Sequence, residues 1–256
     1  MAPPDSRLPT ADPKAAGRPM RYAQATRTAT YGFLSALPLL VLYESLIWLT
    51  NEGRIAQVRV GAEVWLKQWL ALAGLAGMHV LAAVVLGVGL VVLWWDRRRR
   101  PPLRLGYFAG IVAESAVYAV GLAVLVSGVV GALFAMALVG APPAEALGLR
   151  LALSIGAGLY EELVFRVLLV GGLYVVLKRI VARPVAAYLA AAVVGALLFS
   201  AVHYLGPLGD PFTLPSFTFR ALFGLALNAV FLARGFGVAA WTHALYDVMV
   251  VTHLLG

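Results

Sequence analysis

The chain has 256 residues, of which 62% are hydrophobic and only 12% are charged. Soluble domains carry charge on roughly 25% of their residues, so this composition excludes an ordinary soluble enzyme or binding domain and indicates a membrane protein. The sequence has no cysteine, which excludes disulfides, thiolate catalysis and cysteine-ligated zinc.

Polar segments interrupt the otherwise apolar chain. Residues 1–26 are rich in Pro, Ala and Arg and lack apolar periodicity, so we predict a disordered, basic, cytoplasmic arm. Residues 54–74 place charges between apolar residues, a pattern typical of a helix in the membrane interface. Residues 96–104 form a basic linker. Apolar runs long enough to cross a bilayer recur at 31–49, 77–95, 107–139, 151–177, 185–205, 215–233 and 236–255.

These runs predict an all-α fold, a polytopic transmembrane helical bundle of about seven spans. The run at 107–139 is too long for one perpendicular crossing, so it is either a hairpin or one tilted helix. A hairpin would turn Lys178, Arg179 and Arg183 to the outside, against the positive-inside rule. We therefore expect a single long helix with an interfacial extension.

The net charge is +8, and the positions of the Lys and Arg residues along the chain indicate the topology in the membrane. With a cytoplasmic N-terminus, the inside segments hold fourteen Lys and Arg residues, whereas the outside segments hold four: Arg54, Arg59, Lys67 and Arg150. This bias follows the positive-inside rule, and it favours contact with anionic lipids over binding of nucleic acid. The short basic loops and the Ala- and Arg-rich composition favour a multi-pass protein of a bacterial inner (cytoplasmic) membrane.

Three ionisable residues, Glu161, Glu162 and Arg166, lie inside the apolar run 151–177. Each costs roughly 2.5–3.5 kcal/mol on insertion into a bilayer, which indicates a functional use. Glu162 and Arg166 are four residues apart and can form an ion pair on one helix face, while Glu161 points about 100° away. One carboxylate is then held ionised while the other can serve as a general base on water. The alternative is a structural ion pair that locks two helices.

Two further runs carry pairs of polar or aromatic residues at the same spacing. The run at 185–205 contains Phe199 and His203, four residues apart. The run at 236–255 contains His243 and Asp247, again four apart. At that spacing Asp247 can orient the imidazole, or both groups can point at one metal or substrate atom. Alternatively, His243 and Asp247 form a hydrogen bond with each other and have no further role.

The patterns EExxxR, FxxxH and HxxxD, in this order on separate apolar helices, resemble the three motifs of the CPBP family (CAAX protease and bacteriocin-processing, or Abi), which includes the type II CAAX prenyl endopeptidases. The resemblance covers roughly residues 150–253 and takes in FRALFGLALN at 219–228, which is similar to the Gly-containing helix of that family. It implies a CPBP-like catalytic transmembrane core over 141–256, while the apolar runs alone predict N-terminal transmembrane helices over 27–140, where no family motif is found.

The resemblance implies an intramembrane endopeptidase. By position, Glu161 is the residue that activates water, Glu162 is its partner, and Arg166 holds the pair. His203, His243 and Asp247 are implied as the remaining catalytic groups. The third motif often ends in Asn, and because an ionised aspartate only accepts hydrogen bonds, we expect Asp247 to orient His243.

The sequence does not decide how the attacking water is activated. Glu161, His203 and His243 would make a three-ligand site for Zn²⁺ or another divalent metal. A metal-free mechanism fits equally, with Glu161 polarising water and a histidine stabilising the oxyanion.

Functions of other classes are also compatible with intramembrane charges. A catalytically inactive membrane scaffold or bacteriocin-immunity protein of the same fold is the alternative to an enzyme, and a proton-coupled transporter would need a repeat that the sequence lacks. Expected partners are membrane lipids and a membrane-associated substrate that is lipidated or carries a leader peptide. We expect Glu44 and Glu114 to pair with Arg220 or to line the cavity.

Overall fold

The computed structural model describes residues 20–50, 58–76, 80–97, 101–134, 146–206 and 209–254. Throughout this part of the chain the regular structure is helical and no strand occurs, which confirms the predicted all-α fold. The elements are α1 (Tyr22–Thr26), α2 (Ala29–Thr50), α3 (Gly61–Leu72), α4 (Val80–Asp96), α5 (Leu105–Phe134), α6 (Leu147–Glu161), η1 (Glu162–Val170), α7 (Gly171–Leu177), α8 (Pro184–Val202), α9 (Leu214–Arg234) and α10 (Phe236–Val251).

Each predicted apolar run corresponds to helix. In the described ranges four helices are long and apolar enough to cross a membrane, namely α2, α5, α8 and α9, and α10 and most of α4 are shorter apolar helices. The protein is therefore an integral membrane protein, while the count of seven crossings stays a prediction. The long run forms one continuous helix, α5, as far as Phe134, and residues 135–139 lie outside the described residues.

The bounds of the predicted polar segments differ slightly from those of the elements in the structure. Residues 1–19 of the predicted disordered arm lie outside the described residues, but Tyr22–Thr26 at its end form the short helix α1, so that boundary is wrong. The predicted interfacial segment forms the helix α3 over Gly61–Leu72. Its Glu63 is fully buried and binds Arg59 and Lys67 as ion pairs, which hold the carboxylate on the inner face of the helix.

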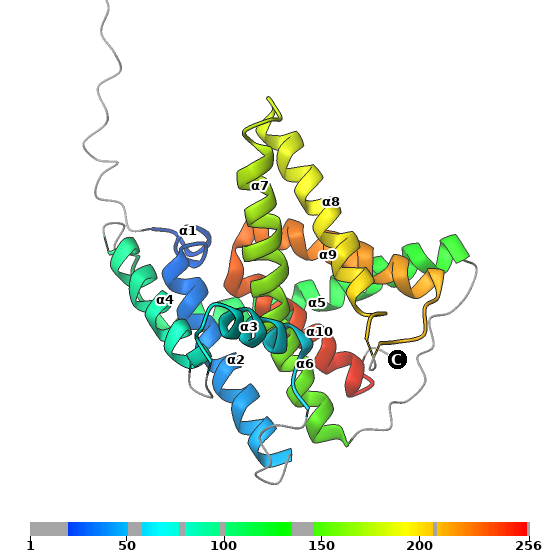
Figure 1. The fold of residues 1–256 in the computed structure, drawn as a ribbon, viewed down its shortest axis with the longest axis horizontal. Helices are drawn as coiled ribbons and strands as arrows, with labels where there is room; N and C mark the ends of the chain where they lie inside the picture. Colours follow the sequence, from blue (N-terminus) through cyan, green and yellow to red (C-terminus); the bar gives the residue numbers. More distant parts are fainter. Residues whose placement is uncertain are drawn as a thin grey trace, which may run out of the picture.

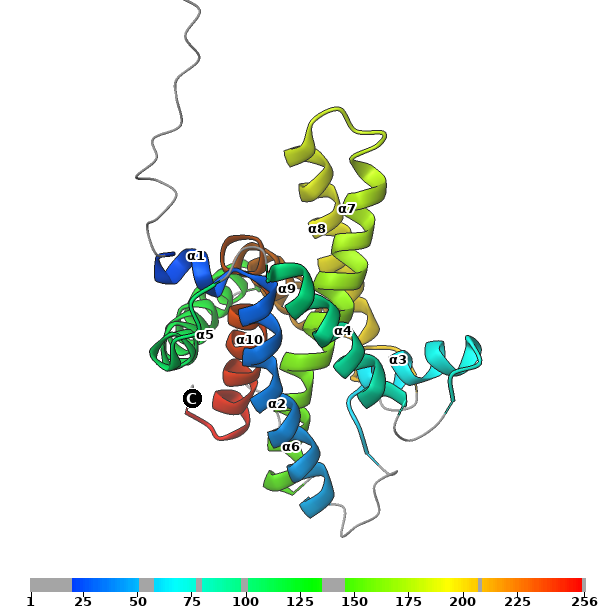
Figure 2. The same cartoon turned by 90° about the vertical axis from the view of Figure 1, so that its left-hand side faces the viewer.

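Helix α10 lies in the middle of the bundle and packs on α2, α5, α6, α9 and η1 (Figures 1 and 2). Its neighbour α6 comes very close, because a Cβ added at Gly158 would lie only 2.5 Å from the Cβ of Ala244 and 2.6 Å from the carbonyl oxygen of Ala240. This approach sets the distance between the helices that carry the first and third motifs. Helices α7 and α8 form an antiparallel hairpin that projects from the bundle in both views.

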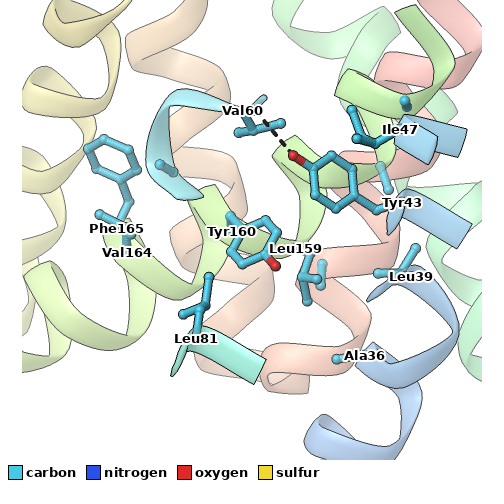
Figure 3. Packing of buried hydrophobic residues seen from close by; sticks show 14 of the residues in the cluster. Ala36, Leu39, Tyr43, Ile47, Val60, Leu81, Leu159, Tyr160, Val164 and Phe165 are labelled. Carbon is cyan, nitrogen blue, oxygen red and sulfur yellow. Dashed lines mark hydrogen bonds between the residues drawn. The ribbon is translucent and has the colours of Figure 1, made fainter. Parts of the chain in front are cut away.

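The largest apolar cluster connects α3 with the motif-bearing helices. Tyr43, Val60 and Tyr160 lie at its centre, and the Tyr43 hydroxyl accepts a hydrogen bond from the Val60 amide at 3.3 Å (Figure 3). At its edge Trp65 packs on Phe165, with ring centroids 6.3 Å apart. Helix α3 is therefore packed directly against the segment that follows Glu161.

The two isolated carboxylates form structural pairs, although not with the expected partner. Glu44 pairs with Arg59 at 2.9 Å. Glu114 pairs with Arg234, whose Nε and one terminal nitrogen donate to it at 2.5 and 2.8 Å. The expected pairing of either with Arg220 is wrong, because each carboxylate meets an arginine that is closer in the fold.

Candidate active site

The predicted ion pair of the first motif is present and fully buried. A terminal nitrogen of Arg166 lies 3.0 Å from Oε1 of Glu162, and the side chains are 1% and 0% exposed. The same oxygen lies 2.8 Å from Nδ1 of His243. One carboxylate oxygen therefore joins the first motif to the third.

The segment that carries this pair is a π-helix, which the sequence did not indicate. It runs over Glu162–Val170, and the amide of Gly171 donates to the carbonyl of Arg166 five residues earlier. Such wide turns are rare in proteins, and those that occur often lie at functional sites. The spacing of four residues still places Glu162 and Arg166 on one face, so the ion pair survives the change of helix type.

Arg166 reaches two further helices from this π-helix. Its second terminal nitrogen lies 3.4 Å from the carbonyl oxygen of Gly224 on α9, and its guanidinium carbon lies 4.6 Å from the ring centroid of Phe199 on α8. A Cβ at Gly224 would lie 3.1 Å from the Phe199 ring and 3.3 Å from the Cα of Ala196. A glycine is needed here because α8 and α9 approach closely, which gives a structural reason for the glycine in FRALFGLALN.

His243 is held between two carboxylates. Because a carboxylate accepts hydrogen bonds, Nδ1 of His243 carries a hydrogen and donates a hydrogen bond to Glu162. Nε2 lies 3.5 Å from Oδ2 of Asp247, so the contact with Asp247 is the longer of the two. We expected Asp247 to orient this ring. The shorter contact is made by Glu162, so Glu162 is the main group that orients His243 and Asp247 is the second. Phe199 and Phe223 pack edge-on to the ring, with centroids 5.9 and 5.7 Å away.

His203 lies directly after α8, and its Nδ1 is 2.7 Å from the carbonyl oxygen of Phe199. A carbonyl can only accept, so Nδ1 carries the proton and Nε2 is available to other groups. The hairpin explains the depth of this residue. The chain runs 16 residues from Glu161 to Leu177 and returns through 19 residues from Pro184 to His203, so the two motifs come back to a similar level.

Glu161 differs from its neighbour in its surroundings, as predicted. It is half-buried at the last position of α6, whereas Glu162 is fully buried. Its charge acts electrostatically on His203, His243 and Asp247, which places it among the other motif residues. The three motifs therefore gather around one place in the bundle.

The metal site expected from Glu161, His203 and His243 is not assembled. Within the described ranges, no three His, Asp or Glu side chains lie in an arrangement that would hold a metal ion. His243 and His203 each engage Nδ1, with Glu162 and with a backbone carbonyl, which leaves Nε2 as the ring nitrogen that could bind a metal. The metal-bound and the metal-free mechanism therefore both stay predictions.

Sequence reasoning missed four buried polar atoms near the site. Oε2 of Glu162, Nε and one terminal nitrogen of Arg166, and the hydroxyl of Thr242 are all buried and have no hydrogen-bond partner among the described groups. Tyr204 directly follows His203 in the sequence and so was expected beside the site, but its hydrogen bonds with Ser216 and Arg220 were not predicted.

Comparison with known proteins agrees with the geometry. Residues 142–249 match the family model of the type II CAAX prenyl endopeptidases, described as Rce1-like. No curated protein and no solved structure gives a significant match. The matched residues include all of EExxxR, FxxxH and HxxxD, whose side chains meet in the structure. The match covers less than half of the chain, and it supports the resemblance of residues 142–249 to the CPBP family that the motifs had indicated.

Proposed function

We propose that the protein is an intramembrane endopeptidase that hydrolyses a peptide bond of a membrane-associated protein. The observation that carries this proposal is the shared carboxylate of Glu162, which binds both Arg166 and His243 at 3.0 and 2.8 Å. A fully buried network of this kind holds the first and third motifs in one geometry. It leaves the half-buried Glu161 beside them as the carboxylate free to act on water.

The proposed reaction uses Glu161 as the general base. Its carboxylate takes a proton from water, the hydroxide adds to the scissile carbonyl carbon, and the proton passes to the nitrogen as the C–N bond breaks. His203 or His243, protonated at Nε2 as well as at Nδ1, donates its Nε2–H to the oxyanion that forms on the carbonyl oxygen. Glu162 and Arg166 position His243 and do not touch the substrate.

The membrane setting and the family match support the proposed substrate class. The family is named for prenylated C-terminal CaaX sequences, in which the lipid is attached to the cysteine. Lipidated proteins, precursors with leader peptides and membrane-bound regulators are the proposed substrates here. Location in a bacterial inner membrane with a cytoplasmic N-terminus is part of the same proposal and rests on the charge bias.

The test compares membranes that contain the wild-type protein with membranes that contain Glu161→Gln. We expect the substrate to accumulate uncleaved with Glu161→Gln, while the thermal unfolding of the purified variant stays close to that of the wild type. Glu44→Gln is the matched control, because it removes the charge of a carboxylate whose side chain is 46% exposed and lies outside the site. Unchanged cleavage by Glu161→Gln would refute the proposal and favour an inactive scaffold.

A further inference from the structure

Arg220 lies in α9 and is held on one side by two hydroxyl groups. One terminal nitrogen donates to the hydroxyl of Tyr204 at 2.8 Å and to that of Ser216 at 3.0 Å. The guanidinium also lies over the Tyr204 ring, 5.1 Å from its centroid. Its other terminal nitrogen lies 2.5 Å from a carboxylate oxygen of Asp210. The position of the guanidinium is thus set by neutral groups, and its charge is met by one loop carboxylate.

This arginine lies next to the catalytic groups. Tyr204 directly follows His203, and the amide of Asp210 donates to the His203 carbonyl at 2.9 Å. One turn further along α9, Phe223 packs on the ring of His243. The charge of Arg220 acts electrostatically on His203 and on Asp247. A group bound by Arg220 would therefore lie beside a peptide held at the site.

The ion pair between Arg220 and Asp210 is weak enough for another carboxylate to replace that of Asp210. The Asp210 side chain is 54% exposed and that of Arg220 is 25% exposed, so solvent screens their attraction. Such pairs contribute little to stability. Arg220 would keep its place without Asp210, because Tyr204 and Ser216 hold it. A second carboxylate can therefore replace that of Asp210 at small cost.

We propose that Arg220 binds the C-terminal carboxylate of the substrate, and that Asp210 occupies this position in the free protein. The planar guanidinium fork matches a carboxylate, and the group that it holds in the free protein is itself a carboxylate. The inference rests on the proposed endopeptidase function and deepens it, since it assigns the residue that recognises the free chain end of a CaaX-type substrate. A lipid phosphate is the competing ligand for the same cation.

The test uses two farnesylated CaaX peptides of identical sequence, one with a free C-terminal carboxylate and one with a carboxamide. Binding to Glu161→Gln is measured in phosphatidylcholine nanodiscs, and cleavage is measured with the active protein. We expect the acid to bind about tenfold more tightly than the amide, as a charge-assisted hydrogen bond allows. Arg220→Gln should abolish this preference. Asp210→Asn should strengthen it by lowering the KM for the acid.

The outcomes separate the possible roles of Arg220. If acid and amide bind equally, or if Asp210→Asn weakens both together with a lower melting temperature, the cluster is a structural clamp and the proposal is wrong. If the effect of Arg220→Gln appears only in nanodiscs with phosphatidylglycerol, and with both peptides alike, a lipid phosphate is the ligand and the proposal is again overturned. Arg220→Lys, which keeps the charge, replaces Arg220→Gln should the latter not fold.

The same experiment distinguishes failure of the carboxylate site from failure of the endopeptidase function. Carboxylate-selective binding without any cleavage by the active protein would refute the endopeptidase function and keep the role of Arg220. Cleavage of acid and amide at equal rates would confirm the endopeptidase function and refute the role of Arg220.

Discussion

Replacing Gly158 by alanine should inactivate the protein while leaving it folded. The new Cβ would lie 2.5 Å from the Cβ of Ala244 and 2.6 Å from the carbonyl oxygen of Ala240, whereas ordinary contact begins at 3.4 Å. Helix α10 must therefore move away from α6 by about 0.9 Å. Overpacking of this kind costs about 1–3 kcal/mol of stability.

The same shift acts on the site because His243 is carried by α10. The bond between His243 and Glu162 is 2.8 Å long, and a shift of about 0.9 Å along it would take it past about 3.2 Å, the usual upper limit for N–H···O. A misplacement of about 1 Å can cost a factor of about 100 in rate. We expect a loss of that size in kcat, measured with the substrate that distinguishes wild type from Glu161→Gln.

The matched control is Gly172→Ala in α7, where an added Cβ meets nothing within 4 Å. This change should leave cleavage intact and raise stability by about 0.4–1 kcal/mol, as a Gly-to-Ala change in a helix allows. Wild-type kcat in Gly158→Ala would show that the α6–α10 distance does not control the site, and the reasoning would be refuted.

Three further outcomes can be measured on the purified protein. Glu114→Gln should lower the unfolding free energy by about 2 kcal/mol without changing cleavage, because it leaves the charge of Arg234 unpaired in a site where both side chains are less than 20% exposed; an unchanged denaturant midpoint would contradict this. Thr242→Val should keep or raise the melting temperature, since the buried hydroxyl has no partner to lose among the described groups, and a clear drop would reveal an unseen hydrogen bond. Treatment with a chelator should separate the two predicted mechanisms: loss of cleavage that zinc restores is expected for a metal-bound water, and unchanged cleavage is expected for water activated by Glu161 alone.

The parts of the fold that follow from local sequence were predictable. Long apolar runs give helices wherever they occur, because backbone groups in lipid must be satisfied within the segment. The ion pair of Glu162 and Arg166 depends only on a spacing of four residues, so it too was accessible. The single helix α5 followed from the placement of Lys and Arg around it.

The parts that depend on packing were not predictable. The contact between Glu162 and His243 joins residues 81 positions apart and exists because Gly158 lets α10 approach α6. The π-helix has no local sequence signal, since its turns are held by contacts with α8 and α10. Glu114 was assigned the wrong partner because Arg234 is distant in sequence and reaches it only through the arrangement of α5, α9 and α10.

The shared carboxylate of Glu162 has a consequence for biogenesis. Arg166 is translated four residues after Glu162, so their mutual neutralisation is available as soon as this helix enters the bilayer. His243 follows Arg166 by 77 residues, which takes a ribosome about 4–15 s at about 5–20 residues per second. During that interval the charged helix must be tolerated by the insertion machinery or by lipid with only its internal counterion. Completion of the candidate site is therefore a late event of synthesis, because it requires α10.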